Sequence, residues 1–189
     1  IKGDSLKIAF AFLLSMPGAP FIYYGDEIGM RYVEGLDSVE GGYGRTGSRS
    51  PMQWDSTTNA GFSSAPKEAL YIRQDESVDR PTAAANMADE NSLWHEINRL
   101  INIRQSHSSL MSKGEIEFVY AEKNEYPLAY VRSADDEKIL VVINPADRNA
   151  AFDYECSIKE SIYSFGGKVS NENGKISVPA KSAGFYIIG

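Results

Sequence analysis

Two adjacent carboxylates, Asp26 and Glu27, follow directly after the apolar run at 21–24. Paired carboxyl groups cleave glycosidic bonds when they lie about 5 to 5.5 Å apart in a retaining enzyme, and further apart in an inverting one. Side chains of neighbouring residues in an extended strand point to opposite faces, so these two are not expected to attack one bond together. The residues alone therefore favour a structural role for this pair over a catalytic one.

A second group of polar and aromatic side chains is Arg45-Thr46-Gly47-Ser48-Arg49-Ser50-Pro51-Met52-Gln53-Trp54-Asp55. A guanidinium presents several N–H donors in a planar fork, which can hold vicinal hydroxyl groups or an acid. Arg45 and Arg49 are thus candidate binding residues. Trp54 can stack on the apolar face of a sugar or fill space inside the fold, and composition favours the second role.

Other reactive groups are sparse in the 189 residues, which include one cysteine and two histidines. His95 and His107 lie twelve residues apart on one expected helix and do not face one ion, so no metal site is predicted. Cys156, placed inside an expected strand, is interpreted as an inert buried thiol.

A formal charge of −7 without a basic run argues against nucleic acid as a partner, and no apolar run approaches the roughly 18 residues of a membrane span. No organic cofactor is indicated.

The positions of the candidate carboxylates and arginines are set by the helices and strands that precede and follow them. Positions 5–14 are apolar nearly all round and predict a buried helix, with Asp4 or Ser5 as its cap. Two prolines and a glycine then break the helix, and residues 21–24 predict a buried strand. A helix, a break and a strand fit one unit of a parallel α/β sheet, in which polar residues just past the strand tend to line the site.

Residues 31–90 show no sustained period and hold six of the 16 glycines. A stretch of that length is too long for an ordinary connection, so a functional loop is expected. A helical period then returns from about 91 to 107, with Asn91 or Ser92 as the cap. Short strands are predicted after it, at 115–120, 127–132, 138–143, 150–154, 176–178 and 184–188. The chain therefore divides into domains 1–112 and 113–189, and the second is an antiparallel sheet or sandwich.

Two longer stretches carry a family resemblance. The first is Pro17-Gly18-Ala19-Pro20-Phe21-Ile22-Tyr23-Tyr24-Gly25-Asp26-Glu27-Ile28-Gly29-Met30; the second runs from Gly44 to Asp55 and continues with Asn59-Ala60-Gly61-Phe62. The first resembles the eighth barrel strand of the α-amylase superfamily (glycoside hydrolase family 13). The second resembles its oligo-1,6-glucosidase and trehalose-synthase branch. The resemblance implies an α+β fragment: the last βα portion of a (β/α)8 TIM barrel, followed by the antiparallel β-sandwich called domain C.

The same resemblance implies that the catalytic carboxylates of the family lie before the first residue of this chain, so no catalytic residue is expected here. Arg49 matches an arginine that holds the non-reducing-end glucose, and Asp26 and Glu27 match acids of the adjoining acceptor region. With Arg45 they form the expected substrate-binding set. Thr46 departs from the family pattern, because many members have Asp at that position.

The resemblance leaves three functions open. The parent protein is expected to hydrolyse short α-glucosides; a trehalose-synthase-like isomerase and a free-standing carbohydrate-binding β-module are the alternatives. The acidic balance and the lone cysteine fit a reducing cytoplasm. A barrel strand without neighbours leaves its ladder groups unpaired, so residues 1 to about 90 of the isolated chain are expected to be loosely ordered, to self-associate, or to adopt packing unlike that of the parent protein.

Overall fold

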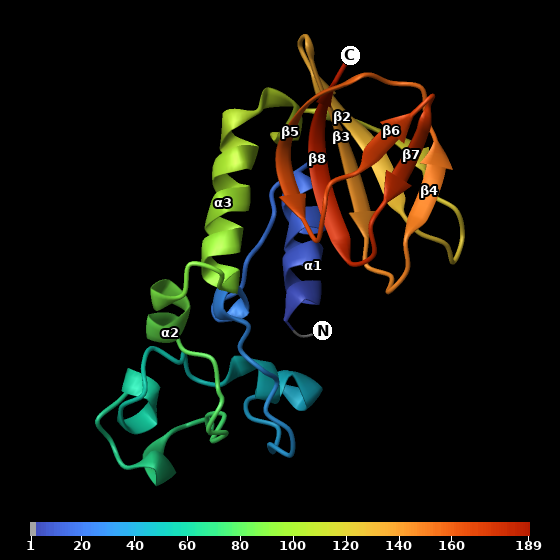
Figure 1. The fold of residues 1–189 in the computed structure, drawn as a ribbon. Helices are drawn as coiled ribbons and strands as arrows, with labels where there is room; N and C mark the ends of the chain where they lie inside the picture. The colour runs from blue at the N-terminus through green and yellow to red at the C-terminus, as the bar shows by residue number, and fades with distance from the viewer. Residues whose placement is uncertain (1–2) are drawn as a thin grey trace. The chain divides into compact units, whose positions relative to one another are not determined.

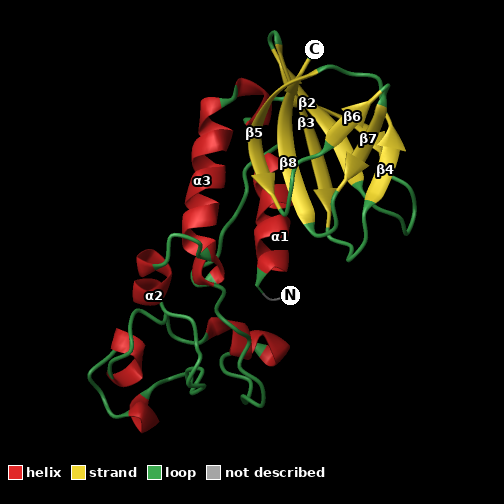
Figure 2. Ribbon diagram, in the orientation of Figure 1, coloured by secondary structure: helices red, strands yellow, loops and turns green. Residues whose placement is uncertain are grey.

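The computed structural model describes residues 3–189, which form two compact units. One unit combines residues 3–21 with 96–189, and the other comprises 22–95. Each is described by itself. Figure 1 labels the elements of both units, and Figure 2 shows that regular strands are confined to the first.

The predicted first helix is confirmed as α1, Asp4–Ser15, which buries Ile8 and Leu14 on one side. Its expected cap is wrong, because neither Asp4 nor Ser5 makes a capping side-chain hydrogen bond. The helix instead starts after Gly3, whose φ of 56° suits glycine, and the N–H of Leu6 donates to the Gly3 carbonyl at 2.9 Å. Asp4 lies in the first turn, where its charge favours the helix dipole.

Two antiparallel sheets make up most of this unit. The larger has the order β1-β2-β3-β8-β5 and the smaller the order β4-β7-β6. Their bounds are β1 Glu115–Tyr120, β2 Leu128–Ala134, β3 Glu137–Asn144, β4 Ala150–Asp153, β5 Ile158–Phe165, β6 Ser170–Glu172, β7 Lys175–Val178 and β8 Ser182–Ile188. All six predicted strands are present; β5 and β6 were not expected. Cys156 precedes β5 and is only half-buried, so its placement in a strand was wrong.

The larger sheet is covered on both faces, and the alternation of its side chains divides them. Ala129 and Val131 of β2 belong to the core between the two sheets, together with Phe152 and Ile176 of the smaller sheet. Tyr130, between them in sequence, points to the opposite face, where its hydroxyl is 2.6 Å from Oγ of Ser15 at the end of α1. Successive side chains of β2 point to opposite faces of the sheet, so one face belongs to the sandwich core and the other is covered by helix α1.

Two buried arginines hold the C-terminal end of α1. Arg132 of β2 is fully buried and donates to the carbonyls of Ser15, Met111, Gly114 and Glu115. Arg104 donates to the carbonyls of Leu14, Met16 and Gly18 at 2.6 to 2.8 Å. The last carbonyls of a helix have no partner within the helix, so these guanidinium groups satisfy acceptors that would otherwise be buried unpaired.

Arg104 belongs to α3, Leu93–Ser106, which confirms the predicted helix from about 91 to 107. Ser92 Oγ accepts from the N–H of His95 at 3.3 Å, so Ser92 is the cap. In the part of α3 that belongs to this unit, Ile97 and Leu100 are buried. Arg99 lies over the ring of Tyr163 in β5, 5.4 Å from its centroid. This pair joins α3 to the edge of the larger sheet.

A further contact fixes the chain between α3 and the sheet. The carboxylate of Glu137, at the start of β3, accepts from Ser109 N–H at 2.9 Å and from the Ser109 hydroxyl, and lies 2.6 Å from His107 Nδ1. Burial by itself raises the pKa of this carboxyl, but the hydrogen bonds from Ser109 and His107 outweigh it, so the pKa is lowered. The ionised form of Glu137 therefore stabilises this junction.

The strand predicted at the start of the unit at 22–95 is absent. Residues 21–24 do not form the predicted buried strand; they are irregular, and Phe21 is 89% exposed and Tyr23 52% exposed. A β-strand exists only through hydrogen bonds to a neighbour, and no segment among residues 3–189 pairs with this one. The rest of the unit consists of loops, one short helix α2, Ala83–Ala88, and the 3-10 turns Asp26–Ile28, Tyr43–Arg49, Thr58–Gly61 and Lys67–Ala69 (Figure 2).

Replacing Arg132 by Leu is expected to lower the free energy of unfolding of this unit by about 3 kcal/mol or more, because four backbone carbonyls lose their donor, those of Ser15 and Gly114 in buried hydrogen bonds. Hydrogen exchange of the β3 amides measures the change. Arg148→Leu, at an exposed position, is the matched control and is expected to stay within about 0.5 kcal/mol. Equal protection of β3 in both variants would contradict the role given to Arg132.

Lowering the pH is expected to remove the contribution of Glu137 to the free energy of unfolding. Its pKa in the folded state is lower than in the unfolded chain, so its stabilisation is complete above the ordinary glutamate pKa and is lost as pH falls through the folded-state value. Urea unfolding from pH 7 to pH 3 should show Glu137→Gln less stable than the parent at neutral pH, with the gap closing in acid. Glu160→Gln, exposed on β5, should show no such gap.

Candidate functional site

The turn that carries Asp26 and Glu27 is closed by their own side chains. Asp26 accepts from the N–H of Tyr23 at 3.1 Å, and Glu27 accepts from the N–H of Gly25 at 2.7 Å. Gly25 has a φ of 89°, and a Cβ there would lie 2.5 Å from Sδ of Met30, so the turn requires glycine. Both carboxylates thus hold backbone, and Asp26 and Glu27 lie in a 3-10 turn rather than just beyond a strand.

The segment with the two arginines is a 3-10 turn, Tyr43–Arg49, built around a buried threonine. Thr46 is 2% exposed; its hydroxyl donates to the Tyr43 carbonyl at 3.2 Å and accepts from the N–H of Val39 at 3.4 Å. The Thr46 side chain therefore faces its own loop. Arg45 and Arg49 both extend from this turn and are exposed.

A third segment, residues 54–65, is fixed by backbone hydrogen bonds and by hydrogen bonds from the Asn59 side chain. The N–H of Trp54 donates to the Ala60 carbonyl at 2.8 Å, and the Trp54 carbonyl accepts from the N–H of Ala84 at 2.8 Å. Asn59 has a φ of 49°, which asparagine tolerates better than most residues, and its amide donates to the carbonyls of Ser63 and Ala65 at 2.9 and 2.7 Å. These bonds set the positions of Trp54 and of the ring that follows, Phe62.

The three segments meet at a pocket of about 460 Å³ within this unit. Its charged lining residues are Glu27 and Arg49. Four aromatic side chains also line it and remain 42% to 66% exposed, namely Tyr24, Trp54, Phe62 and Tyr71. Pro51, Met52 and Ile72 complete the lining. Pockets of this size and apolar character commonly take small ligands.

Tyr24 connects the aromatic and the charged parts of the pocket. Its hydroxyl donates to the Ser50 carbonyl at 3.1 Å, and its ring lies 4.5 Å from that of Tyr23. Burial and the neighbouring Tyr23 raise the pKa of Tyr24, while the Arg49 guanidinium acts in the opposite direction. Tyr24 is therefore a neutral hydroxyl at neutral pH. Together the pocket offers stacking faces, one cationic fork and one carboxylate, which can bind a polyol but do not form an acid–base pair.

The pocket contains two of the four predicted substrate-binding residues, Glu27 and Arg49. Asp26 and Arg45 do not line it. The sequence reasoning missed Tyr24, Phe62 and Tyr71, and it favoured a space-filling role for Trp54, which is half-exposed at the pocket. One signal was present in the sequence: the region 31–90 has no core periodicity, so its aromatic residues have no evident packing partners.

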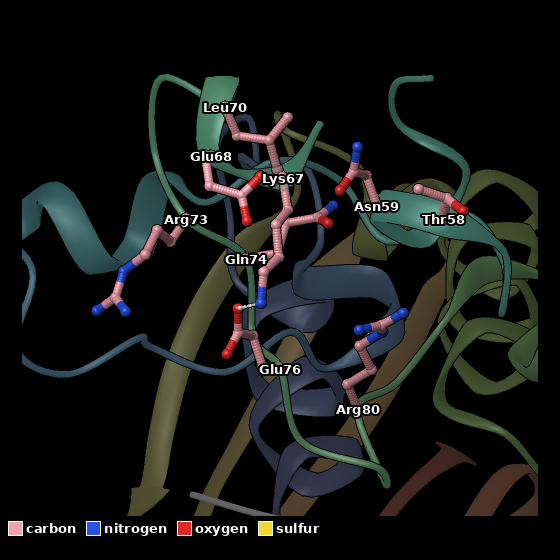
Figure 3. Close-up of a pocket in the computed structure, with 9 residues that line it drawn as sticks. All are labelled: Thr58, Asn59, Lys67, Glu68, Leu70, Arg73, Gln74, Glu76 and Arg80. Carbon is pink, nitrogen blue, oxygen red and sulfur yellow. Dashed lines mark ion pairs between the residues drawn. The ribbon is translucent and has the colours of Figure 1, made fainter. Parts of the chain in front are cut away.

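A second pocket of about 740 Å³ in the same unit is polar (Figure 3). Its Lys67 ammonium lies 3.7 Å from the Glu76 carboxylate, and the Arg73 guanidinium points away from that pair. None of the predicted site residues lines it. Because none of them lies there, we regard the aromatic pocket as the candidate site.

Within residues 3–189, no group of three or more His, Cys, Asp or Glu side chains is arranged to hold a metal ion. Over the same residues, no helix has both the length and the apolar character that crossing a bilayer requires.

Asn59→Ala is expected to loosen the 54–65 segment, because it removes two hydrogen bonds and places a less tolerant residue at positive φ. Amide exchange and limited proteolysis should show higher susceptibility at 60–65, with a shift in the fluorescence of Trp54. Ser64→Ala, exposed in the same segment, is the control. Unchanged protection in Asn59→Ala would show that other contacts fix the segment.

Comparison with known proteins gives matches along the whole chain. Residues 1–114 match the family model described as alpha amylase, catalytic domain, and residues 116–187 match that of the maltogenic amylase C-terminal domain. A trehalose synthase of Thermus thermophilus is 34% identical over 151 residues, which cover 78% of this chain and 15% of that protein. An oligo-1,6-glucosidase of Parageobacillus thermoglucosidasius is 28% identical over 177 residues, which cover 79% of this chain and 31% of that protein.

Among solved structures, the trehalulose synthase MutB of Pseudomonas mesoacidophila MX-45 superposes with a TM-score of 0.84 at 23% identity, covering 98% of this chain and 38% of its own. This likeness supports the fold: the end of an α-amylase-type catalytic domain followed by an antiparallel β domain. The chain spans well under half the length of these relatives. With a catalytic-domain model matched over more than half of its residues, the chain belongs to the α-amylase family, glycoside hydrolase family 13.

Proposed function

We propose that this chain is the C-terminal part of a retaining enzyme that hydrolyses short α-glucosides. The observation that carries the proposal is that Glu27 and Arg49 line one pocket with four partly exposed aromatic rings. Aromatic faces and a planar guanidinium are the groups that bind the apolar face and the hydroxyls of a pyranose. The oligo-1,6-glucosidase match and a 31% identical glucan 1,6-alpha-glucosidase of Streptococcus pneumoniae support this substrate class.

In this proposal, Arg49 holds the hydroxyls of the terminal glucose, and the aromatic rings face the group to which that glucose is linked. Glu27 lies beside them, with one oxygen bound to Gly25 N–H. The carboxylates that perform the reaction belong to polypeptide outside these 189 residues. Asp26 and Arg45 do not line the pocket, and this proposal gives them no contact with the bound glucose. The lone Cys156 supports a reducing, cytoplasmic location for the protein.

An isomerase is the second candidate, and the 34% identical trehalose synthase favours it. Hydrolysis and isomerisation share the glucose-binding step and differ in whether water or a sugar hydroxyl accepts the glucosyl group. Incubation of the longest natural polypeptide that contains this chain with maltose separates them. Free glucose as the main product supports the hydrolase, and trehalose supports the isomerase.

A free-standing carbohydrate-binding β-module has little support. Such modules present several aromatic rings on one exposed face. Tyr130 is fully buried and Tyr120 packs on Phe152, with 5.4 Å between ring centroids. Among Phe118, Tyr120, Tyr126 and Tyr130, only Phe118 and Tyr126 are about half-exposed.

Arg49→Ala in that longest natural polypeptide is expected to lower kcat/KM for isomaltose or maltose by more than tenfold, because a charged donor to the sugar hydroxyls is lost. Steady-state kinetics measure the effect. Arg49→Lys keeps the charge but loses the fork, and is expected to recover only part of the activity.

Arg73→Ala is the matched control, since Arg73 is an exposed arginine of the same unit that does not line the aromatic pocket. A loss below tenfold in Arg49→Ala, or an equal loss in both variants, would refute the role assigned to Arg49.

A further inference from the structure

The 3-10 turn Tyr43–Arg49 carries two arginines, of which only Arg49 lines the candidate pocket. A 3-10 helix has three residues per turn, so side chains three positions apart lie on the same face. Arg49 therefore shares a face with Thr46. Arg45 lies on another face with Ser48, whose hydroxyl donates to the Arg45 carbonyl at 2.8 Å. The rotation of the turn about its own axis thus decides which arginine faces the pocket.

The third face of the turn is docked on residues 24–33 through backbone carbonyls. The acceptors are two carbonyls of the turn and the carbonyl of the residue directly after it, each three positions from the next. The three bonds are from the Tyr24 hydroxyl to Ser50 at 3.1 Å, from the Tyr32 hydroxyl to Gly44 at 2.9 Å, and from the N–H of Val33 to Gly47 at 3.0 Å. Because three positions complete one turn of a 3-10 helix, the acceptors lie along one side, and the bonds fix the rotation of the turn.

Gly47 is the point of closest approach between the turn and residues 24–33. A Cβ at Gly47 would overlap the carbonyl oxygen of Val33 and would lie 2.7 Å from Cζ of Tyr32. At Gly44, one turn earlier on the same face, a Cβ would meet nothing within 4 Å. The docking therefore requires glycine at one of these two positions and not at the other.

The face that carries Arg49 lies over a second glycine, Gly42. A Cβ at Gly42 would lie 2.6 Å from Oγ1 of Thr46 and 3.6 Å from Nη1 of Arg49. The Thr46 side chain is buried between the turn and the loop before it. The absence of a side chain at Gly42 thus leaves room for the Arg49 guanidinium on this face.

We propose that Tyr24, Tyr32 and Gly47 are positioning residues for sugar binding. By docking one side of the 3-10 turn they fix its rotation, so that Arg49 rather than Arg45 faces the sugar. The inference rests on the proposed function, in which Arg49 holds the hydroxyls of the terminal glucose. A turn released from this docking samples other rotations, and the apparent affinity for the sugar falls with the fraction of molecules that keep Arg49 in the pocket.

Amide exchange of residues 43–50, in the longest natural polypeptide that contains this chain, tests the docking. Gly47→Ala adds a methyl group at the point of closest approach, and exchange there is expected to rise by about tenfold or more. Gly44→Ala adds the same group where there is room and is the matched control, with exchange expected within about twofold of the parent. Tyr24→Phe combined with Tyr32→Phe removes two of the three bonds and should also raise exchange. Parental exchange in both Gly47→Ala and the double variant would overturn the inference.

Steady-state kinetics on maltose or isomaltose test the positioning role. Tyr32 does not line the pocket, so its hydroxyl acts through the turn, and Tyr32→Phe is expected to lower kcat/KM by about two- to tenfold. In the Arg49→Ala background the same substitution should cost less than about twofold, because the group that it positions is gone. Tyr43→Phe, at a 76% exposed position of the same turn, is the control and should leave kcat/KM unchanged. An equal loss from Tyr32→Phe with and without Arg49, as a merely structural role predicts, would overturn the inference.

The two proposals fail in different ways. Hydrolysis or isomerisation of α-glucosides without coupling between Tyr32 and Arg49 leaves the proposed function standing and overturns the positioning role. Absence of any reaction with α-glucosides overturns the proposed function, and calorimetric titration with maltose then decides the positioning role. Binding should be weaker in Tyr32→Phe than in Tyr43→Phe. Equal affinities, or no binding to the parent polypeptide, would overturn the inference in that case.

Discussion

Two guanidinium groups on the carbonyl end of one helix are the constraint on which the sheet-containing unit depends. Arg104 and Arg132 donate to backbone carbonyls at the end of α1, in the turns near it and at Glu115 of β1. Burial lowers the pKa of both, and the proximity of Arg104 lowers that of Arg132 further. An arrangement that places two cations close together in a buried region needs compensation, and the negative end of the α1 dipole supplies part of it.

The same contacts tie distant parts of the sequence into one unit. Arg132 lies on the helix-covered face of β2, beside Tyr130, and it reaches α1 as well as the turn at 111–114. Gly114 is required there, because a Cβ would lie 2.0 Å from the Ser109 carbonyl. A hydrophobic residue in place of Arg132 could fill the space but could not satisfy these carbonyls. The polar interaction therefore specifies how helix, turn and sheet join, while the apolar core between the sheets supplies the bulk of the stabilisation.

Periodic segments were predictable from the sequence, and segments defined by distant partners were not. Helices α1 and α3 and six strands follow from local patterns that tertiary packing also requires, as in Leu140 and Val142, which alternate into the sandwich core, whereas α2 lies in the aperiodic stretch and was not predicted. Strand β5 carries Lys159, Glu160 and Ser161 and pairs only with β8, so its pattern resembles a loop. Residues 21–24 have strand-like composition, but a strand needs a partner that composition cannot supply. Arg49 and Glu27 were predicted as binding residues from the family motifs, whereas Phe62 was part of a motif without an assigned role, and Tyr71 lines the same pocket only through the course of an aperiodic loop.

The unit at 22–95 is stabilised differently, and this difference determines what its site can do. Without a sheet, its backbone groups are satisfied largely by polar side chains: Asp26, Glu27, Asp55 and Asn59 all hold nearby backbone. Carboxylates used in this way are poorly placed to exchange protons with a substrate, since doing so would release the turns that they close. What remains free to face a ligand is a set of aromatic rings and the Arg49 fork. A segment built in this manner offers a binding surface rather than a pair of groups for acid–base chemistry.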